Sequence, residues 1–85
     1  MSSEMFDANA FSGYRVLITG SSRGIGHEVA TALRRLGADI AVHGTNAPDA
    51  AQYGAGPGAL VSLAGDFREN GVAATVVNAA VEQLG

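Results

Sequence analysis

The 85-residue sequence predicts an α/β fold built around a parallel sheet. Its N-terminal half contains a short apolar run, then a glycine-rich turn over Gly20–Gly26, then apolar residues at helical spacing. A second apolar segment begins within two residues of the end of that expected helix. A strand, a helix and a strand joined this closely imply parallel pairing with a right-handed crossover.

The first strand and the first helix are expected on either side of the turn. The strand covers residues 14–19, and its continuous Val16-Leu17-Ile18 run is typical of a strand covered on both faces. The helix ends at Gly37, a position where glycine commonly caps a helix in the left-handed conformation. One stripe of this helix is expected to face the sheet, and it comprises Ile25, Val29, Leu33 and Leu36.

Two more strands and a second helix complete the expected chain. Strands are predicted over Asp39–His43 and Ala59–Ala64, with up to two turns of helix between them at Ala47–Tyr53. Small and apolar residues then recur at helical spacing through Asn70–Leu84. The expected inner face of this last helix comprises Ala73, Val76, Val77, Ala80, Val81 and Leu84.

The composition argues against several classes of function. The net charge is −3 and the five arginines are the only lysine or arginine residues, so a nucleic-acid surface is not predicted. Cysteine is absent, so a disulfide framework is excluded, and no metal site is predicted. No run approaches the roughly 18 apolar residues of a membrane span. Residues 1–10 lack the pattern of a signal peptide and are expected to form a flexible leader on a cytoplasmic protein.

Three glycines form the pattern G-x-x-x-G-x-G between the first strand and the first helix: Gly20, Gly24 and Gly26. They permit, in order, a tight turn, close approach of backbone to a pyrophosphate, and close packing of helix on sheet. Amide groups at the helix N-terminus then attract an anion. The same turn matches the nucleophile pattern G-x-S-x-G around Ser22, but the chain has little room for a catalytic triad. A lysine-dependent phosphate loop is excluded because the chain has no lysine.

The residues Thr19–Gly26, Thr-Gly-Ser-Ser-Arg-Gly-Ile-Gly, resemble the T-G-x-x-x-G-x-G motif of the short-chain dehydrogenase/reductase family. Leu17-Ile18, Gly37-Ala38 and Gly65-Asp66 match this family as well, and the 3-oxoacyl carrier-protein reductase branch is the nearest in style. The resemblance implies a partial Rossmann fold, which is a doubly wound parallel sheet with its strands in the order 3-2-1 and flanking helices. Residues 11–85 would form a truncated NAD(P)-binding domain.

The resemblance also implies which residues bind the cofactor. Contacts with the phosphates and the adenosine ribose would come from the turn, through Gly20, Ser22, Arg23, Gly24, Ile25 and Gly26. Asp66 would bond the adenine amino group, or else be a solvated carboxylate at a strand end. Phe67 would lie beside the adenine ring.

Two features favour NADP over NAD. No carboxylate follows the second strand, where an acidic residue would bind the ribose hydroxyls and repel a 2′-phosphate. Arg23 precedes the second glycine, where a guanidinium can pair with a phosphate. Thr45 and Asn46 would hydrogen-bond a ribose hydroxyl or a phosphate oxygen, or form plain loop. His43 would help to bind the phosphate or form a partly exposed strand end, and His27 is expected at the surface.

The chain lacks the residues that the family uses for chemistry. Hydride transfer to a carbonyl needs a proton donor, which the family supplies with serine, tyrosine and a lysine four residues after the tyrosine. The sequence has only Tyr14 and Tyr53 and no lysine, so no catalytic residue is predicted. Three interpretations stay open: the NADP(H)-binding part of a longer oxidoreductase, a non-catalytic nucleotide-binding module acting with a partner chain, and a folded remnant. Family members are commonly homo-oligomers.

Overall fold

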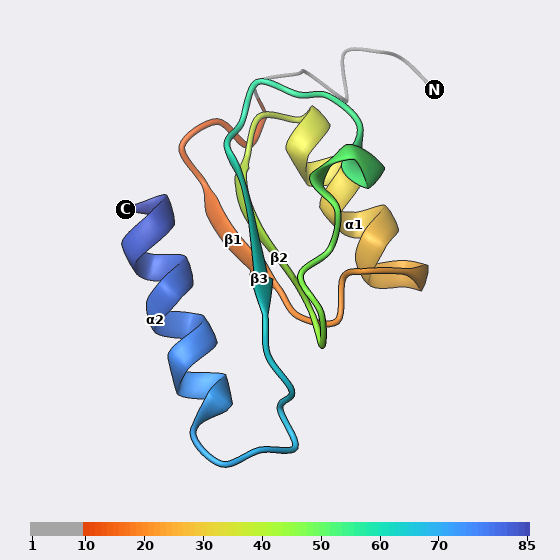
Figure 1. Ribbon diagram of the computed structural model, residues 1–85. Helices are drawn as coiled ribbons and strands as arrows, with labels where there is room; N and C mark the ends of the chain where they lie inside the picture. The colour runs from red at the N-terminus through yellow and green to blue at the C-terminus, as the bar shows by residue number, and fades with distance from the viewer. Residues whose placement is uncertain (1–9) are drawn as a thin grey trace.

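The computed structural model describes residues 10–85, so the expected leader lies almost wholly outside the described residues. A parallel sheet separates two helices, one on each of its faces (Figure 1). The elements in chain order are β1 (Arg15–Ile18), α1 (Gly24–Arg35), β2 (Asp39–Gly44), the 3₁₀ helix η2 (Ala50–Tyr53), β3 (Leu60–Ala64) and α2 (Val72–Leu84). No helix of the described residues is long and apolar enough to cross a membrane.

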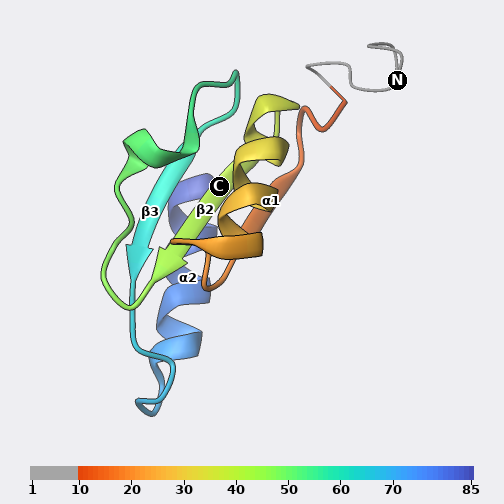
Figure 2. The same ribbon diagram turned by 90° about the vertical axis from the view of Figure 1, so that its right-hand side faces the viewer.

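The sheet has the order β1-β2-β3, which is the predicted 3-2-1 order read from the opposite edge. Both pairings are parallel, with Ile18 beside Val42 and His43 beside Leu63. Residues 40–44 of the central strand are buried. Because the strands are parallel, their carboxyl ends meet at one edge of the sheet, as the arrowheads of β2 and β3 show (Figure 2). This edge also carries the glycine turn.

Alternate strand residues build a separate core on each face of the sheet. The core under α1 comprises Ala30, Ala38, Ile40, Val42 and Tyr53. The core under α2 comprises Ala41, Leu63, Val76 and Ala80. The continuous apolar runs of the strands are explained by this two-sided covering.

The expected helix faces are only partly correct. Ile25 and Val29 are 82% and 44% exposed. The reason is that α1 packs against the sheet through Ala30, the residue that follows Val29. On α2, Val77 and Val81 are also exposed, while Val76 and Ala80 are buried. Helical spacing identifies the apolar side of a helix, but the neighbouring strands determine which part of that side is covered.

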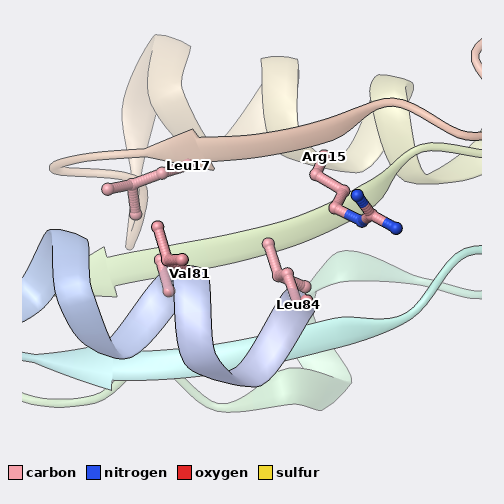
Figure 3. Close-up of a pocket in the computed structure, with 6 residues that line it drawn as sticks. Arg15, Leu17, Val81 and Leu84 are labelled. Carbon is pink, nitrogen blue, oxygen red and sulfur yellow. The ribbon is translucent and has the colours of Figure 1, made fainter.

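β1 is covered on both faces as predicted, with Val16 and Ile18 against the core under α1 and Leu17 against the core under α2, but it is only half-buried. Within residues 10–85 it pairs with β2 alone, so its other edge is free. A cavity of about 260 Å³ lies between β1 and α2 on this side. Leu17 and Arg15 of β1 and Val81 and Leu84 of α2 line it (Figure 3).

The segment between β2 and β3 contains a single 3₁₀ turn rather than the two helical turns expected. The Asp49 side chain caps η2 by accepting from the amide of Ala51 at 3.0 Å. Gly54 has a φ of +68° and ends η2, and its carbonyl accepts a hydrogen bond from Arg34 of α1. The segment is therefore tied to α1.

Substitutions on the buried and the exposed side of α2 test how this helix packs on the sheet. Val76→Ala is expected to lower the free energy of unfolding by about 2 kcal/mol, because it removes two buried methyl groups and leaves a cavity. Its neighbour Val77 is 47% exposed, so Val77→Ala is the matched control, with an expected change of about 0.5 kcal/mol or less. Urea denaturation measures both changes, and equal losses would contradict the assigned faces.

Candidate functional site

The glycine turn between β1 and α1 has the geometry that its sequence requires. Gly20 and Gly24 have φ values of +60° and +66°, which residues with a side chain rarely adopt. Glycine is required at position 26 for a different reason: a Cβ there would lie 2.8 Å from the carbonyl oxygen of Gly20. The first two glycines shape the turn, and the third lets the helix approach it.

The N-terminus of α1 is open to an anion. The helix begins at Gly24 after an extended Arg23, whose side chain makes no cap hydrogen bond. The first turn carries no acidic residue, and Ile25 is highly exposed. The first amide groups of a helix have no partner within the helix, so here they can bind an anion.

Ser21, rather than Ser22, fixes the turn to the sheet. Ser21 is fully buried, and its amide donates to the carbonyl oxygen of His43 at 2.8 Å. Its hydroxyl accepts from the amide of His43 at 2.8 Å and lies 3.3 Å from the same carbonyl oxygen. Ser21 thus extends the pairing of β1 with β2 beyond the last strand residue. Sequence reasoning missed it, because the motif does not distinguish the two serines.

Tyr53 of η2 holds the turn in place through a second buried hydrogen bond. It is fully buried, and its hydroxyl donates to the carbonyl oxygen of Ser21 at 2.7 Å. Burial raises the pKa of this hydroxyl above its ordinary value, so it remains a donor at neutral pH. His27 lies at the surface, partly exposed, with Nε2 2.7 Å from the carbonyl oxygen of Gln52 and its ring 4.8 Å from that of Tyr53.

His43 joins the turn to the end of β3. It is only 5% exposed, so the expectation of a partly exposed strand end is wrong. Nδ1 accepts from the amide of Gly20 at 3.1 Å, and Nε2 lies 2.8 Å from the carbonyl oxygen of Gly65. The ring also stacks on Phe67, with centroids 4.3 Å apart. Both ring nitrogens are therefore engaged within the protein, which leaves neither of them for a phosphate.

Asp66 and Arg68 form an ion pair just after β3. Arg68 Nη2 lies 2.7 Å from Asp66 Oδ2, and its Nε lies 3.0 Å from Oδ1. The Arg68 guanidinium, followed by the Arg68 amide, holds the pKa of the Asp66 carboxyl below its ordinary value. An exposed pair of this kind contributes little to stability, but it orients the carboxylate. Asp66 is therefore not a freely solvated carboxylate.

The residues expected to bind the cofactor all follow a strand at the carboxyl edge of the sheet. The turn follows β1, Asn46 and Thr45 are exposed after β2, and Asp66 and the 41% exposed Phe67 follow β3. Ligands of open α/β sheets bind at this edge. The cavity lined by Arg15 lies between β1 and α2 instead, and none of these residues lines it. We call the edge of the sheet that carries the expected cofactor-binding residues the ledge. Residues 10–85 contain no cluster of potential metal ligands.

The fold and the turn define a dinucleotide-binding class of α/β protein, and comparison with known families makes the assignment specific. The family described as short chain dehydrogenase matches residues 14–85. The chain belongs to this family. The resemblance found in the glycine motif is thereby confirmed, while the narrower 3-oxoacyl carrier-protein reductase branch is not singled out.

Individual relatives agree with this assignment. The chain is 48% identical over 50 residues to gluconate 5-dehydrogenase of Gluconobacter oxydans (strain 621H), covering 56% of this chain and 20% of that protein. It is 52% identical over 40 residues to elsinochrome reductase 1 of Elsinoe fawcettii, covering 47% and 15%. A crystal structure of a dehydrogenase/reductase from Sinorhizobium meliloti 1021 superposes with a TM-score of 0.74 at 27% identity, covering 99% of this chain and 35% of that one. The matched segments therefore span a fifth or less of the length of these curated relatives.

Removing the hydroxyl of Tyr53 tests whether its hydrogen bond to Ser21 stabilises the turn. Tyr53→Phe is expected to lower the free energy of unfolding by about 1–3 kcal/mol, because the buried Ser21 carbonyl loses its donor. Tyr14 is 60% exposed, so Tyr14→Phe is the matched control with little expected change. Thermal and denaturant unfolding measure both variants. A loss no greater than the control would show that the hydroxyl does not support the turn.

The ion pair between Asp66 and Arg68 predicts that the pKa of Asp66 depends on the Arg68 side chain. Arg68→Ala is expected to return the pKa of Asp66 toward its ordinary value, because the first cause of the lowered pKa is removed. In the wild type the ionised pair is present at neutral pH and is lost as the pH falls through the lowered pKa of Asp66. Carboxyl ¹³C NMR follows the change, with Glu69 as an internal reference, and an unmoved Asp66 would contradict the pairing.

Proposed function

We propose that this chain is the NADP(H)-binding segment of a short-chain dehydrogenase-type oxidoreductase. The observation that carries the proposal is the turn, where two glycines at positive φ and an uncapped helix N-terminus form an anion cradle. The pyrophosphate would lie against these amides, within the contact set Gly20, Ser22, Arg23, Gly24, Ile25 and Gly26. The family membership of residues 14–85 supports a nicotinamide dinucleotide as the ligand.

The charges around the ledge support NADP over NAD. Arg23 is exposed beside the turn and makes no ion pair among residues 10–85. After β2 the chain places uncharged Thr45 and Asn46, so no carboxylate there repels a 2′-phosphate. Arg23 would bind that phosphate, and Asn46 would hydrogen-bond the phosphate or the ribose.

The segment after β3 would hold the adenine. Asp66 is a carboxylate at neutral pH, and its oxygens would accept from the adenine amino group beside the bonds that they already receive from Arg68. Phe67 is partly exposed while one face of its ring stacks on His43. The adenine would pack beside Phe67.

The chemical step would need residues that this chain does not supply. Bound NADP(H) supplies the hydride, but neither tyrosine of the chain has a lysine four residues after it. Tyr53 is buried and donates to Ser21, which is a structural task. We infer that this segment binds and orients the cofactor, and that another part of the protein provides the proton donor.

A non-catalytic module that acts with a second chain is the other candidate. Within residues 10–85 the other edge of β1 is unpaired and an apolar cavity lies beside it, and a strand supplied by a second chain would cover both. The two candidates differ in chemistry. Carbonyl reduction by a protein that includes this segment would support the oxidoreductase, and cofactor binding without any hydride transfer would support the module.

The cofactor preference is tested by titrating the chain with NADP⁺ and NAD⁺ in a calorimeter. Arg23→Ala is expected to weaken NADP⁺ binding about tenfold and to change NAD⁺ binding much less, because only NADP⁺ carries the 2′-phosphate. Arg35 is exposed on the last turn of α1, so Arg35→Ala is the matched control for loss of one positive charge. Equal losses for the two cofactors would contradict the preference for NADP, and no binding of either would contradict the proposed function.

A further inference from the structure

His43 occupies a position from which one side chain reaches both neighbouring strand ends. It is the penultimate residue of β2, which lies between β1 and β3. Its ring contacts Gly20 in the turn after β1, and Gly65 and Phe67 in the segment after β3. It therefore spans the two parts of the ledge assigned above to the pyrophosphate and the adenine.

The two hydrogen bonds of the ring specify one protonation state. The amide of Gly20 is a donor, so Nδ1 must carry a lone pair to accept from it. The carbonyl oxygen of Gly65 is an acceptor, so Nε2 must carry the hydrogen. Only the neutral Nε2–H tautomer satisfies both partners. In an imidazolium, the Nδ1–H would point at the amide hydrogen of Gly20.

The described residues around the His43 ring offer no free negative charge that would stabilise an imidazolium. The ring is 5% exposed, with Phe67 stacked on one face. At the Gly65 corner α2 presents the apolar side chains of Val72 and Val76. The charged groups on the adjoining segments are Arg23 in the turn and Asp66 and Arg68 after β3, and the Asp66 carboxylate is already paired with Arg68.

We propose that neutral His43 is a positioning residue for the cofactor site, which holds the glycine turn and the adenine segment in register and releases the turn when it is protonated. The inference rests on the proposed function of the ledge. His43 touches the backbone of the turn and acts on the cofactor only through it.

The second histidine provides a natural contrast. Nε2 of His27 lies against the carbonyl oxygen of Gln52, and a protonated ring donates to a carbonyl as well as a neutral one does. Acidification therefore leaves the His27 bond intact and breaks the bond from Gly20 to His43. His27→Asn is the control variant for the titration.

The first measurement needs no cofactor. Ring ¹⁵N NMR of the chain is expected to show an unprotonated Nδ1 and a protonated Nε2 for His43 at pH 8. The Gly20 amide signal should shift with the titration of His43 and not with that of His27. A protonated Nδ1 at pH 8, or a Gly20 amide that ignores the titration of His43, would overturn the proposal.

The second measurement is binding of NADP⁺ to the wild type and to His43→Asn between about pH 8 and pH 5.5, the range that brackets imidazole titration. Asparagine offers an uncharged amide oxygen near the position of Nδ1. The 2′-phosphate titrates near pH 6 as phosphate monoesters do, so the readout is the ratio of the wild-type Kd to the variant Kd. This ratio is expected to rise toward low pH, because the imidazolium cannot accept the bond from the amide of Gly20 whereas the asparagine oxygen still can.

One further variant separates positioning from folding. His43→Leu has no acceptor, so it should bind NADP⁺ weakly at every pH, while His43→Asn should bind close to the wild type at pH 8. Circular dichroism at each pH verifies that the compared chains stay folded. A ratio that does not change with pH, or equally poor binding by His43→Asn and His43→Leu at pH 8, would overturn the inference while leaving the proposed function standing. Absence of NADP⁺ binding by the wild type at pH 8 would instead contradict the proposed function, and the NMR titration would still decide the state of His43.

Discussion

The exchange of hydrogen bonds between Ser21 and His43 is the constraint on which the site depends. A glycine-rich turn has no rigid shape of its own, because glycine has the greatest conformational freedom of any residue. Here Ser21 is bonded to the backbone of β2 through its amide and its hydroxyl. Tyr53 holds the Ser21 carbonyl from the other side. The turn can therefore present its amide groups in a fixed direction without a bound ligand.

This arrangement divides the tasks of an anion site between two kinds of residue. Gly20 and Gly24 give the backbone a path that brings amide groups toward the ledge, and Gly26 lets α1 begin close to the strand. None of these glycines can hold the path in place. The holding groups are the buried polar side chains of Ser21 in the turn, His43 in β2 and Tyr53 in η2, whose partners lie within the protein. Electrostatic attraction and rigidity thus arise from different residues.

The sequence was informative where the structure follows local rules and uninformative where distant segments meet. The three strands, both helices and the parallel pairing follow from apolar runs, helical spacing and short connections, and the structure confirms them. The exposure of Ile25 and Val81 was not predictable, because it depends on which strands lie beneath each helix. The burial of His43 and the choice of Ser21 over Ser22 depend on contacts between residues 22 positions apart. No local pattern encodes such a contact.

The long sequence separation of the contacts around the turn has a thermodynamic consequence. The bonds to Ser21 join residues 22 and 32 positions apart, so the turn exists only when β1, β2 and η2 are all in place. A dinucleotide that binds the turn then binds the native chain and not the unfolded one. At a free concentration one hundred times its Kd, such a ligand stabilises the native state by about 2.7 kcal/mol. For a domain of this size that is a large share of the total stability, so the occupancy of the ledge and the survival of the fold are linked.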